Sequence, residues 1–399
     1  MDDDTFWVGL DLGLTRTSVC IMNGQGFPLN EFECDSEVAA LTEALAAVAI
    51  DRIGGIAVEA GTGTYIVRKL RGAGFPVVVF EARKAHKFLA LRRNKSDASD
   101  ARGLADLVRI GQNSVSQVHL KTDECQRLRS FLVVRQRFVL MKLAVEGVLR
   151  CNFALHGRRL ESSHTRKALL RRTETIFASL RSEEGIDLEP DLAPLVMVCD
   201  SVRAYLEKSD RDLQAIASSH PVCRLLMEVP GVGPICALSF YSAIGDPNRF
   251  RVASHVGAYL GLVPRRYQSG AVSRTLGITK NGNRLTRSHL VMAAAVFARR
   301  APDCPLKDWY LALRGRAGPK RARIALARKL AVILLAMWKQ GTHFELDRTG
   351  PSGVLSERGP TETVPVAPVG GDWRRQSGTE KVTSRSHLRQ GSGDNTPGA

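Results

Sequence analysis

Apolar residues in the first quarter of the chain alternate between strand-like and helix-like spacing. The runs that read as strands are residues 6–13, 17–22, 27–34, 54–60 and 76–82. The runs with helical periodicity are residues 36–50 and 65–74. A turn-forming NGQG follows the second strand, so the chain is expected to begin with a hairpin or meander. Strands that later alternate with helices predict an α/β sheet covered by helices.

The strand pattern disappears between residues 116 and 220, where apolar residues recur at helical spacing close to heptads. One set is Leu128, Phe131, Leu132, Phe138, Val139 and Leu143, and the other is Leu195, Val198, Val202, Tyr205, Leu206, Leu213 and Ile216. A polar stretch at 181–194 separates them. The pattern predicts two long helices joined by a flexible section. Such an antiparallel coiled-coil arm would suit dimerisation or the spanning of a nucleic acid.

The last part of the chain changes character twice. Residues 221–343 have the composition of a compact, mainly helical domain. Its apolar run at 330–338 is too short to cross a bilayer and is flanked by Lys329 and Lys339, so we expect a core helix. Residues 344–399 are rich in Pro, Gly, Ser and Thr and are expected to be disordered. The expected division is therefore 1–115, 116–220, 221–343 and 344–399.

The net charge of the chain gives information about its binding partners rather than about its fold. The chain of 399 residues carries 57 Lys+Arg against 40 Asp+Glu, a formal net charge of +17. Basic clusters spread along the whole chain favour a polyanion such as nucleic acid, although solvated basic faces would give the same count. The eight cysteines form no CxxC pair and, with the histidines, no zinc-ligand spacing. Together with an acidic amino terminus, this predicts a soluble intracellular protein with reduced thiols.

Four carboxylates are candidates for a metal site. Asp97 and Asp100 lie three apart in KSDASDA, where a helix beginning at an N-cap Ser96 would explain them without any further role. Asp11 lies in the first strand and Glu59 ends the strand IAVEA. Carboxylates from two central strands and one helix face can converge. Their repulsion is relieved by cations, for which Mg²⁺ is the natural choice because it prefers oxygen ligands.

The first strand also allows an interpretation other than a metal site. GLDLGLTRTS resembles the phosphate-binding turn of the actin, chaperone and sugar-kinase group. Those proteins need a second Asp-x-Gly turn, which this sequence lacks, and a charge of +17 does not suit a sugar kinase. The metal-site interpretation is therefore preferred.

Two further stretches are candidates for contact with nucleic acid. Gly231 and Gly233 in EVPGVGPIC could present backbone N–H groups to a phosphate, as in helix-hairpin-helix modules, or form a tight helix connector. Ser269 lies in a strongly basic stretch that contains Arg265, Arg266, Arg274, Lys280, Arg284 and Arg287. A serine among guanidinium groups could attack a phosphodiester, although Ser-Gly is also ordinary loop chemistry.

In their order and spacing these motifs resemble the transposases of the insertion-sequence 110 family, also called bridge-RNA-guided serine recombinases. The resemblance spans residues 6–343. The matching pieces are DLG at 11–13, VEAGTGTY at 58–65, KSDASDA at 95–101, PGVGPICALSFYSAIGD at 230–246, YLGLVPRRYQSG with GITKNGNR at 259–284, and ARKLAVILLAMWKQGTHF near the carboxy terminus.

The resemblance implies a RuvC-like domain of the ribonuclease-H type with a DEDD quartet, which falls on Asp11, Glu59, Asp97 and Asp100. It implies a coiled-coil arm and a transposase domain whose catalytic serine falls on Ser269. It further implies a covalent phosphoserine link to DNA, a Mg²⁺ site and a noncoding guide RNA that pairs with element-end and target DNA. The tail beyond residue 345 has no counterpart in the family core.

Three functions stay open from the sequence. The preferred one is a recombinase that moves its own element, bound to double-stranded DNA and guide RNA, acting as a homo-oligomer in the bacterial cytoplasm at the nucleoid. The second is a RuvC-type metal-dependent nuclease in which Ser269 is only a loop residue. The third is a nucleic-acid-binding protein without catalysis.

Overall fold

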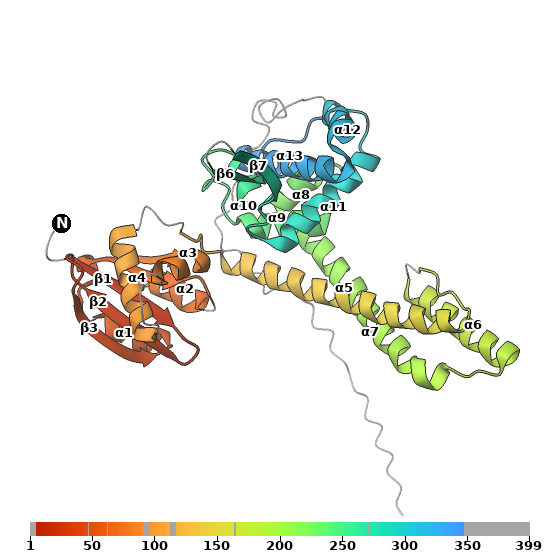
Figure 1. Ribbon diagram of the computed structural model, residues 1–399, viewed down its shortest axis with the longest axis horizontal. Helices are drawn as coiled ribbons and strands as arrows, with labels where there is room; N and C mark the ends of the chain where they lie inside the picture. The colour runs from red at the N-terminus through yellow and green to blue at the C-terminus, as the bar shows by residue number, and fades with distance from the viewer. Residues whose placement is uncertain are drawn as a thin grey trace, which may run out of the picture. The chain divides into compact units, whose positions relative to one another are not determined.

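The computed structural model describes residues 5–346 except residues 47, 62, 91–95, 112–116, 163–164 and 270–271, and the side chains of 266–276 also lie outside the described part (Figure 1). By contacts, the chain divides into two compact units, Met1–Val134 and Arg135–Ala399. The boundary falls inside one long helix. Each unit is described by itself below.

The first unit is built on a five-stranded sheet of order β3-β2-β1-β4-β5. Its strands are β1 (Phe6–Leu12), β2 (Arg16–Met22), β3 (Pro28–Asp35), β4 (Ile53–Glu59) and β5 (Val77–Phe80). The first three form an antiparallel meander, as the turn chemistry of NGQG predicts. β4 runs parallel to both β1 and β5, which places the two candidate strand carboxylates, Asp11 and Glu59, on neighbouring strands.

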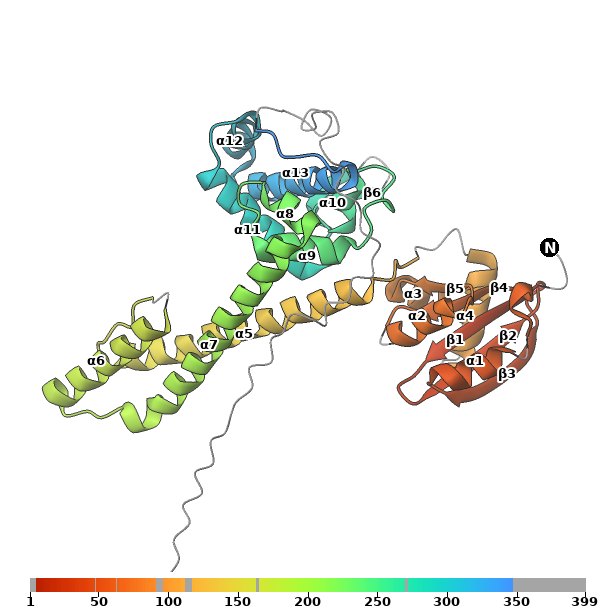
Figure 2. The same ribbon diagram turned by 180° about the vertical axis from the view of Figure 1, so that it is seen from behind.

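Helices cover both faces of this sheet (Figures 1 and 2). They are α1 (Val38–Ala46), a short 3₁₀ turn (Ile50–Arg52), α2 (Thr64–Gly72), α3 (Ala82–Leu89) and α4 (Asp97–Gly111). On one face Val8, Leu10 and Val58 pack with side chains of α1 and α2. On the other face Ala57 and Val78 pack with Ala85 of α3 and with Leu104, Leu107 and Val108 of α4. Adjacent residues of one strand thus serve opposite cores, as the two-residue period of a strand requires.

The second unit begins with a helical region that has its own hydrophobic core. Its helices are α5 (Asp123–Leu155), α6 (Arg166–Glu184) and α7 (Glu189–Ser219). Leu149 and Phe153 of α5 pack with Phe177 of α6 and Val196 of α7. The sequence predicted two long helices with a flexible section at 181–194. That prediction was wrong in extent, because α6 is a third helix and residues 185–188 alone separate it from α7.

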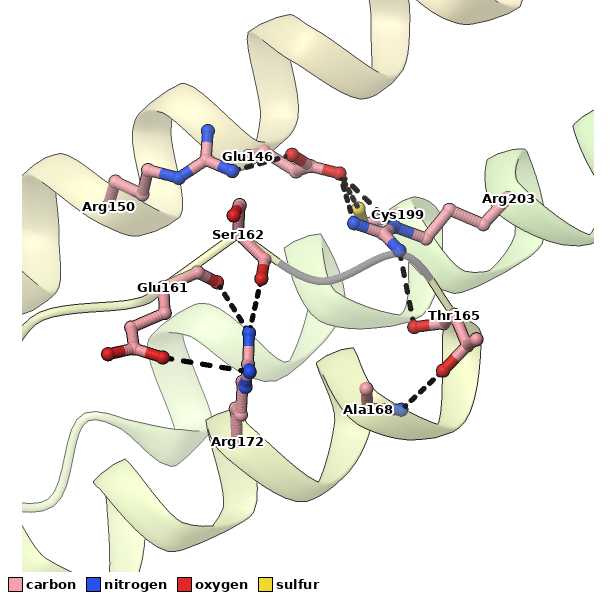
Figure 3. A network of polar contacts seen from close by, with 9 residues as sticks. All are labelled: Glu146, Arg150, Glu161, Ser162, Thr165, Ala168, Arg172, Cys199 and Arg203. Carbon is pink, nitrogen blue, oxygen red and sulfur yellow. Dashed lines mark hydrogen bonds and ion pairs between the residues drawn. The ribbon is translucent and has the colours of Figure 1, made fainter.

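A buried charge network ties these three helices together (Figure 3). Glu146 of α5 accepts hydrogen bonds from Arg203 of α7 at 3.1 and 2.6 Å, and the two side chains are only 5% and 8% exposed. Arg203 also donates to the backbone oxygen of Thr165 at 3.2 Å. The Thr165 hydroxyl in turn accepts from the Ala168 N–H at 3.2 Å and so caps α6.

The rest of the second unit is mainly helical, as predicted, and it also contains a two-stranded sheet that was not predicted. The elements are α8 (Pro221–Met227), α9 (Pro234–Ile244), α10 (His255–Tyr259), β6 (Pro264–Ser269), β7 (Val272–Ile278), α11 (Arg284–Arg300), α12 (Pro305–Ala317) and α13 (Pro319–Gln340). The apolar run at 330–338 is a buried part of α13, which confirms the core helix. No helix in the described part of the chain is long and apolar enough to cross a membrane. The predicted disordered tail lies, from residue 347 on, outside the described residues.

Candidate functional site

Asp11 and Glu59 project from the face of the sheet that α4 covers. Leu10 pairs with Val58 across β1 and β4, so the next residue on each strand, Asp11 and Glu59, falls in one row. Val58 belongs to the core under α1 and α2, while Ala57 belongs to the core under α4. Because side chains alternate between faces, Glu59 shares the face of Ala57. The same alternation puts Asp11 on the face of Gly9, which lies against α4.

The direction of α4 brings its first turn toward that row. Val108 of α4 lies against Gly55, and Ala105 and Ala101 lie against Gly9, one row further along the strands. The helix therefore runs opposite to β1 and β4. One further row along the strands, about 7 Å, corresponds to about four helix residues, so the turn holding Asp97 and Asp100 lies over the ends where Asp11 and Glu59 are placed.

Close packing and two arginines fix α4 in this position. A Cβ on Gly9 would come within 1.9 Å of the Ala101 backbone oxygen, so only glycine lets helix and strand approach this closely. Arg102 forms a bidentate pair with Glu31 of β3, with Nε to Oε1 at 2.7 Å and Nη2 to Oε2 at 2.5 Å. Arg109 reaches the Gly24 backbone oxygen at 3.4 Å. The basic residues of α4 thus attach it to the opening meander.

The helix-cap interpretation of KSDASDA is also confirmed. The Ser99 N–H donates to the Ser96 hydroxyl at 3.2 Å, and the Asp100 N–H donates to the Ser96 backbone oxygen at 2.8 Å. Ser96 therefore caps the helix, and Asp97 and Asp100 occupy the first turn that favours negative charge. Asp97 is exposed and Asp100 is half-buried, so the cap leaves both carboxylates open to solvent.

The four carboxylates suit a metal ion by chemistry more than by their present spacing. All their donor atoms are oxygens, as hard divalent cations require, and all come from one end of one sheet face. Asp11 and Glu59 are half-buried rather than enclosed in the core. Among the described residues, however, no three His, Cys, Asp or Glu side chains lie close enough together to hold an ion.

The backbone places Ser269 at the tip of a β-hairpin in the second unit. Ser269 ends β6 and is paired in register with Val272, the first residue of β7. Gly270, the residue that follows Ser269, lies outside the described residues, as does the side chain of Ser269 itself.

The base of this hairpin is anchored by Arg287. The sequence placed Arg287 among the cations around the serine, and that prediction was wrong. Its side chain is buried and its Nη1 donates to the backbone oxygens of Leu260 at 2.9 Å and Asn281 at 2.7 Å. Burial lowers the pKa of the Arg287 guanidinium. Nothing in the sequence separates this arginine from its neighbours, because a backbone-binding arginine has no local signature.

A glycine and a lysine with left-handed backbone support the same anchor. Gly282 has φ 70°, and a Cβ there would lie 2.1 Å from the Tyr259 backbone oxygen. Lys280 has φ 58°, the one described residue other than glycine with a positive φ, and its N–H donates to the Gly261 oxygen at 3.2 Å. Such strain in a non-glycine residue persists only where the surroundings hold it.

The remaining predicted cations divide into two groups. Arg265, Lys280 and Arg284 are exposed near the hairpin base, where a polyanion could reach them. The side chains of Arg266 and Arg274 lie outside the described part, although their backbones pair within the hairpin strands.

The two glycines of EVPGVGPIC have different surroundings. Gly231 has φ 87°, and a Cβ there would lie 2.6 Å from the Ala293 backbone oxygen of α11, so it serves as a close-packed connector. Gly233 is the N-cap residue of α9, is exposed and has open space beside it. The connector interpretation thus explains Gly231, while the phosphate-binding interpretation stays a prediction for Gly233.

Most of the cysteines are buried thiols rather than candidate nucleophiles. All eight are free, which agrees with the prediction of reduced thiols, and six are buried. Burial raises the pKa of Cys236 to about 12 and, together with Glu31, that of Cys20 to about 12. Thiols of this kind are inert at neutral pH because the thiolate is the reactive form.

Comparison with known proteins assigns both halves of the chain. A family model described as "Transposase", for DEDD transposases of the IS110 type, matches residues 8–153, and the model "Transposase IS116/IS110/IS902 family" matches residues 223–309. The first match contains Asp11, Glu59, Asp97 and Asp100, and the second contains Ser269.

Curated relatives agree with the family models. The chain is 30% identical over 302 residues to the transposase for insertion sequence element IS1111A of Coxiella burnetii, covering 73% of this chain and 79% of that protein. It is 27% identical to a probable family 20 transposase of Pseudomonas aeruginosa, covering 72% and 84%. A shorter match, 32% identical over 30% of this chain and 38% of the relative, is the pilin gene-inverting protein of Moraxella bovis. This chain belongs to the IS110 family of transposases and is a DNA transposase or recombinase.

Proposed function

We propose that this transposase cuts and rejoins DNA through a covalent phosphoserine at Ser269, with the carboxylates Asp11, Glu59, Asp97 and Asp100 assisting the reaction. The observation that carries the proposal is the convergence of the first turn of α4 on the row of Asp11 and Glu59. The first unit has the topology expected of a RuvC-like domain, with an antiparallel meander followed by parallel strands and crossover helices. The position of Ser269 at a hairpin tip suits a nucleophile that must enter DNA.

The proposed chemistry is a balanced exchange of phosphodiester bonds. The Ser269 oxygen forms a bond to phosphorus, and the bond from phosphorus to one deoxyribose oxygen breaks. The serine proton is passed on and ends on the leaving deoxyribose hydroxyl. Attack by a hydroxyl of the new strand reverses these steps and frees the serine. The bond energy is kept in the enzyme–DNA link, so no nucleotide hydrolysis is required.

The carboxylates are proposed to hold a divalent cation, Mg²⁺ by preference. Such an ion, when bound, would offset the negative charge that develops on the phosphate. Asp11 and Glu59 would hold it from the sheet, and Asp97 and Asp100 from the start of α4. Asp97→Asn should weaken Mg²⁺ or Mn²⁺ binding in calorimetry while the melting temperature falls only slightly, because Asp97 is exposed and its charge contributes modestly at the helix start. Unchanged metal binding would exclude Asp97 as a ligand.

A denaturing gel separates the three candidate functions. The protein is incubated with element-end DNA, and a protein–DNA adduct that survives denaturation supports the serine mechanism. Free nicks without an adduct would favour a RuvC-type nuclease, in which Ser269 has no chemical role. Binding without either product would favour a non-catalytic nucleic-acid-binding protein.

A noncoding guide RNA is proposed as a second nucleic-acid partner, with the nucleoid as the place of action. Its support is the family resemblance together with a net charge of +17 and the exposed cations near the hairpin base. Sequencing of RNA that copurifies with the protein tests it. Recovery of an RNA encoded beside the gene is expected, and a random RNA population would contradict guidance.

We propose that the protein forms a homo-oligomer through α5, on which exposed apolar residues recur every seven positions. Val134, Met141, Val148 and Leu155 are 44%, 46%, 46% and 81% exposed, and small residues, Ala144 and Cys151, lie between the later ones. Exposed apolar residues at heptad spacing are the pattern with which helices of two chains pair. Light scattering should show that Met141→Glu with Val148→Glu shifts the protein toward monomer. Gln214→Glu on α7 is the control, and an unchanged mass in both would refute this interface.

A further inference from the structure

The turn between α12 and α13 carries a dense group of exposed cations. Gly318, with φ 80°, joins the two helices. We call the group the α12–α13 patch, and its members are Arg314, Arg316, Lys320, Arg321 and Arg323. All five side chains are exposed. The apolar side of α13 is buried against the rest of the unit, so the patch stands on a rigid element (Figure 1).

No acidic residue balances the α12–α13 patch. The sequence has neither Asp nor Glu between Asp308 and Glu345, and none of the five cations pairs with a carboxylate among the described residues. Elsewhere some exposed arginines are paired, for example Arg16 with Glu33 at 3.6 Å and Asp35 at 3.1 Å. The patch differs from these sites because residues 309–344 contain no carboxylate at all.

The arrangement costs the free protein electrostatic energy. Like charges crowd one turn, and Lys320 and Arg321 lie in the first turn of α13, where the helix dipole favours anions. A positive charge at a helix start is unfavourable, most strongly at low salt. A bound polyanion would remove both penalties. A conflict of this kind, with no compensation inside the chain, is typical of binding surfaces.

The aromatic residues nearby indicate which polyanion fits. Proteins that hold single strands or RNA loops offer exposed aromatic rings on which bases stack. Here Tyr310 is buried, at 5% exposure, and the half-buried Trp309 has the Lys329 ammonium 4.0 Å from its ring centroid. The described residues of α12 and α13 therefore offer charge without a stacking platform. That chemistry suits the phosphate backbone of a duplex rather than unpaired bases.

We propose that the α12–α13 patch binds the backbone of duplex DNA and holds it independently of sequence. The surface lies beyond residue 309, where the matched family model ends. The inference is independent of the proposed serine chemistry, because a DNA-holding surface is needed whichever group cuts the strand. It predicts lower affinity for duplex DNA, with product formation unchanged once DNA is saturating.

The test measures the binding of the full chain to a duplex of arbitrary sequence by fluorescence anisotropy at several salt concentrations. The variant carries Arg316→Gln, Lys320→Gln and Arg321→Gln. Each lost phosphate contact lowers the slope of log affinity against log salt by about 0.9, so three should lower it by about 2.7. At about 0.1 M salt the affinity should fall about 500-fold, and the difference should vanish toward 1 M.

Two control variants make the result decisive. One removes three exposed cations from α6 and α7, through Arg171→Gln, Lys208→Gln and Arg211→Gln, and should change the slope by less than about one contact. The other, Arg316→Lys with Arg321→Lys, keeps the charge and should keep the slope. Equal losses in the patch variant and the first control would mean that only net charge matters, which overturns the proposal. Loss of binding to a hairpin RNA with duplex DNA binding intact would also overturn it.

Discussion

At the scale of single residues, the position of the first turn of α4 depends on the absence of a side chain at Gly9. A Cβ there would lie 1.9 Å from the Ala101 backbone oxygen and 2.5 Å from the Ala105 nitrogen, so Gly9→Ala must push the helix away from the strand. Overpacking of this kind costs about 1–3 kcal/mol or more. We expect a matching loss of unfolding free energy in denaturant titration, and weaker metal binding because the helix carries Asp97 and Asp100.

Gly72→Ala is the matched control for this substitution. Gly72 ends α2, and a Cβ there meets nothing within 4 Å. Alanine should be neutral or stabilise by up to about 1 kcal/mol through helix propensity. If Gly9→Ala were as stable as Gly72→Ala, the close approach of α4 to β1 would be incorrect.

His289 gives a prediction about pH at the same scale. Burial, with a further contribution from Arg135, lowers the pKa of His289 from 6.5 to about 4. Between these two values the unfolded chain binds a proton that the folded protein does not, so this residue lowers stability as pH falls from about 6.5 toward 4. In His289→Gln that part of the loss should disappear, at most about 1.4 kcal/mol per pH unit. Parallel stability profiles of the two proteins would contradict the burial of a neutral imidazole.

The surroundings of some site residues could be predicted from the sequence better than those of others. Asp11 and Glu59 could be placed because both sit at the end of recognisable strands, where alternation and parallel pairing determine which side chains are neighbours. Arg287 could not, because an arginine that donates to the Leu260 and Asn281 oxygens looks the same in sequence as one that faces solvent. The same holds for Gly231 and Gly233, whose different roles depend on how closely α11 approaches.

At the scale of elements, the buried pair Glu146–Arg203 is expected to hold α5, α6 and α7 together (Figure 3). Arg203→Met removes a partner and leaves a carboxylate that is 5% exposed, which costs about 3–5 kcal/mol in such pairs. Urea unfolding followed by circular dichroism measures the loss. Helices α5, α6 and α7 should unfold before the rest of the protein, because the Thr165 backbone oxygen loses its hydrogen-bond donor as well.

Arg150 offers a control on the same carboxylate. It binds the other oxygen of Glu146 at 2.8 Å, but its side chain is 39% exposed. Pairs four residues apart on an exposed helix face contribute about 0.3–0.5 kcal/mol, so Arg150→Met should cost little. Similar losses for the two substitutions would show that the interior pair has no special role.

Element boundaries in this region were misjudged for a physical reason. The flexible section at 181–194 is predicted because the stretch is polar, and it also contains Gly185, Pro190 and Pro194. Glycine also ends helices in the left-handed conformation, as Gly185 does with φ 66°, and proline is tolerated in a first turn, where Pro190 lies. The β6–β7 hairpin was missed because its many cations conceal the alternation of a strand.

At the scale of the whole molecule, the order of the secondary-structure elements could be predicted much better than the chemistry. A sheet domain, a helical region and a mainly helical domain each leave a periodic pattern over many residues. The proposed catalytic residues leave no such pattern, because Ser269 and the four carboxylates are single residues far apart along the chain, and each also has an ordinary structural explanation. The family models that match residues 8–153 and 223–309 contain all five residues, whereas the chemistry proposed for them is still to be measured.

The most direct test of the central claim is to identify the amino acid that becomes joined to DNA. The protein is reacted with element-end DNA, denatured, digested with nuclease and trypsin, and analysed by mass spectrometry. We predict a peptide that carries a residual nucleotide on Ser269, and no adduct from Ser269→Ala although that variant still binds DNA. A nucleotide on any other residue, or an adduct that persists in Ser269→Ala, would contradict the serine mechanism.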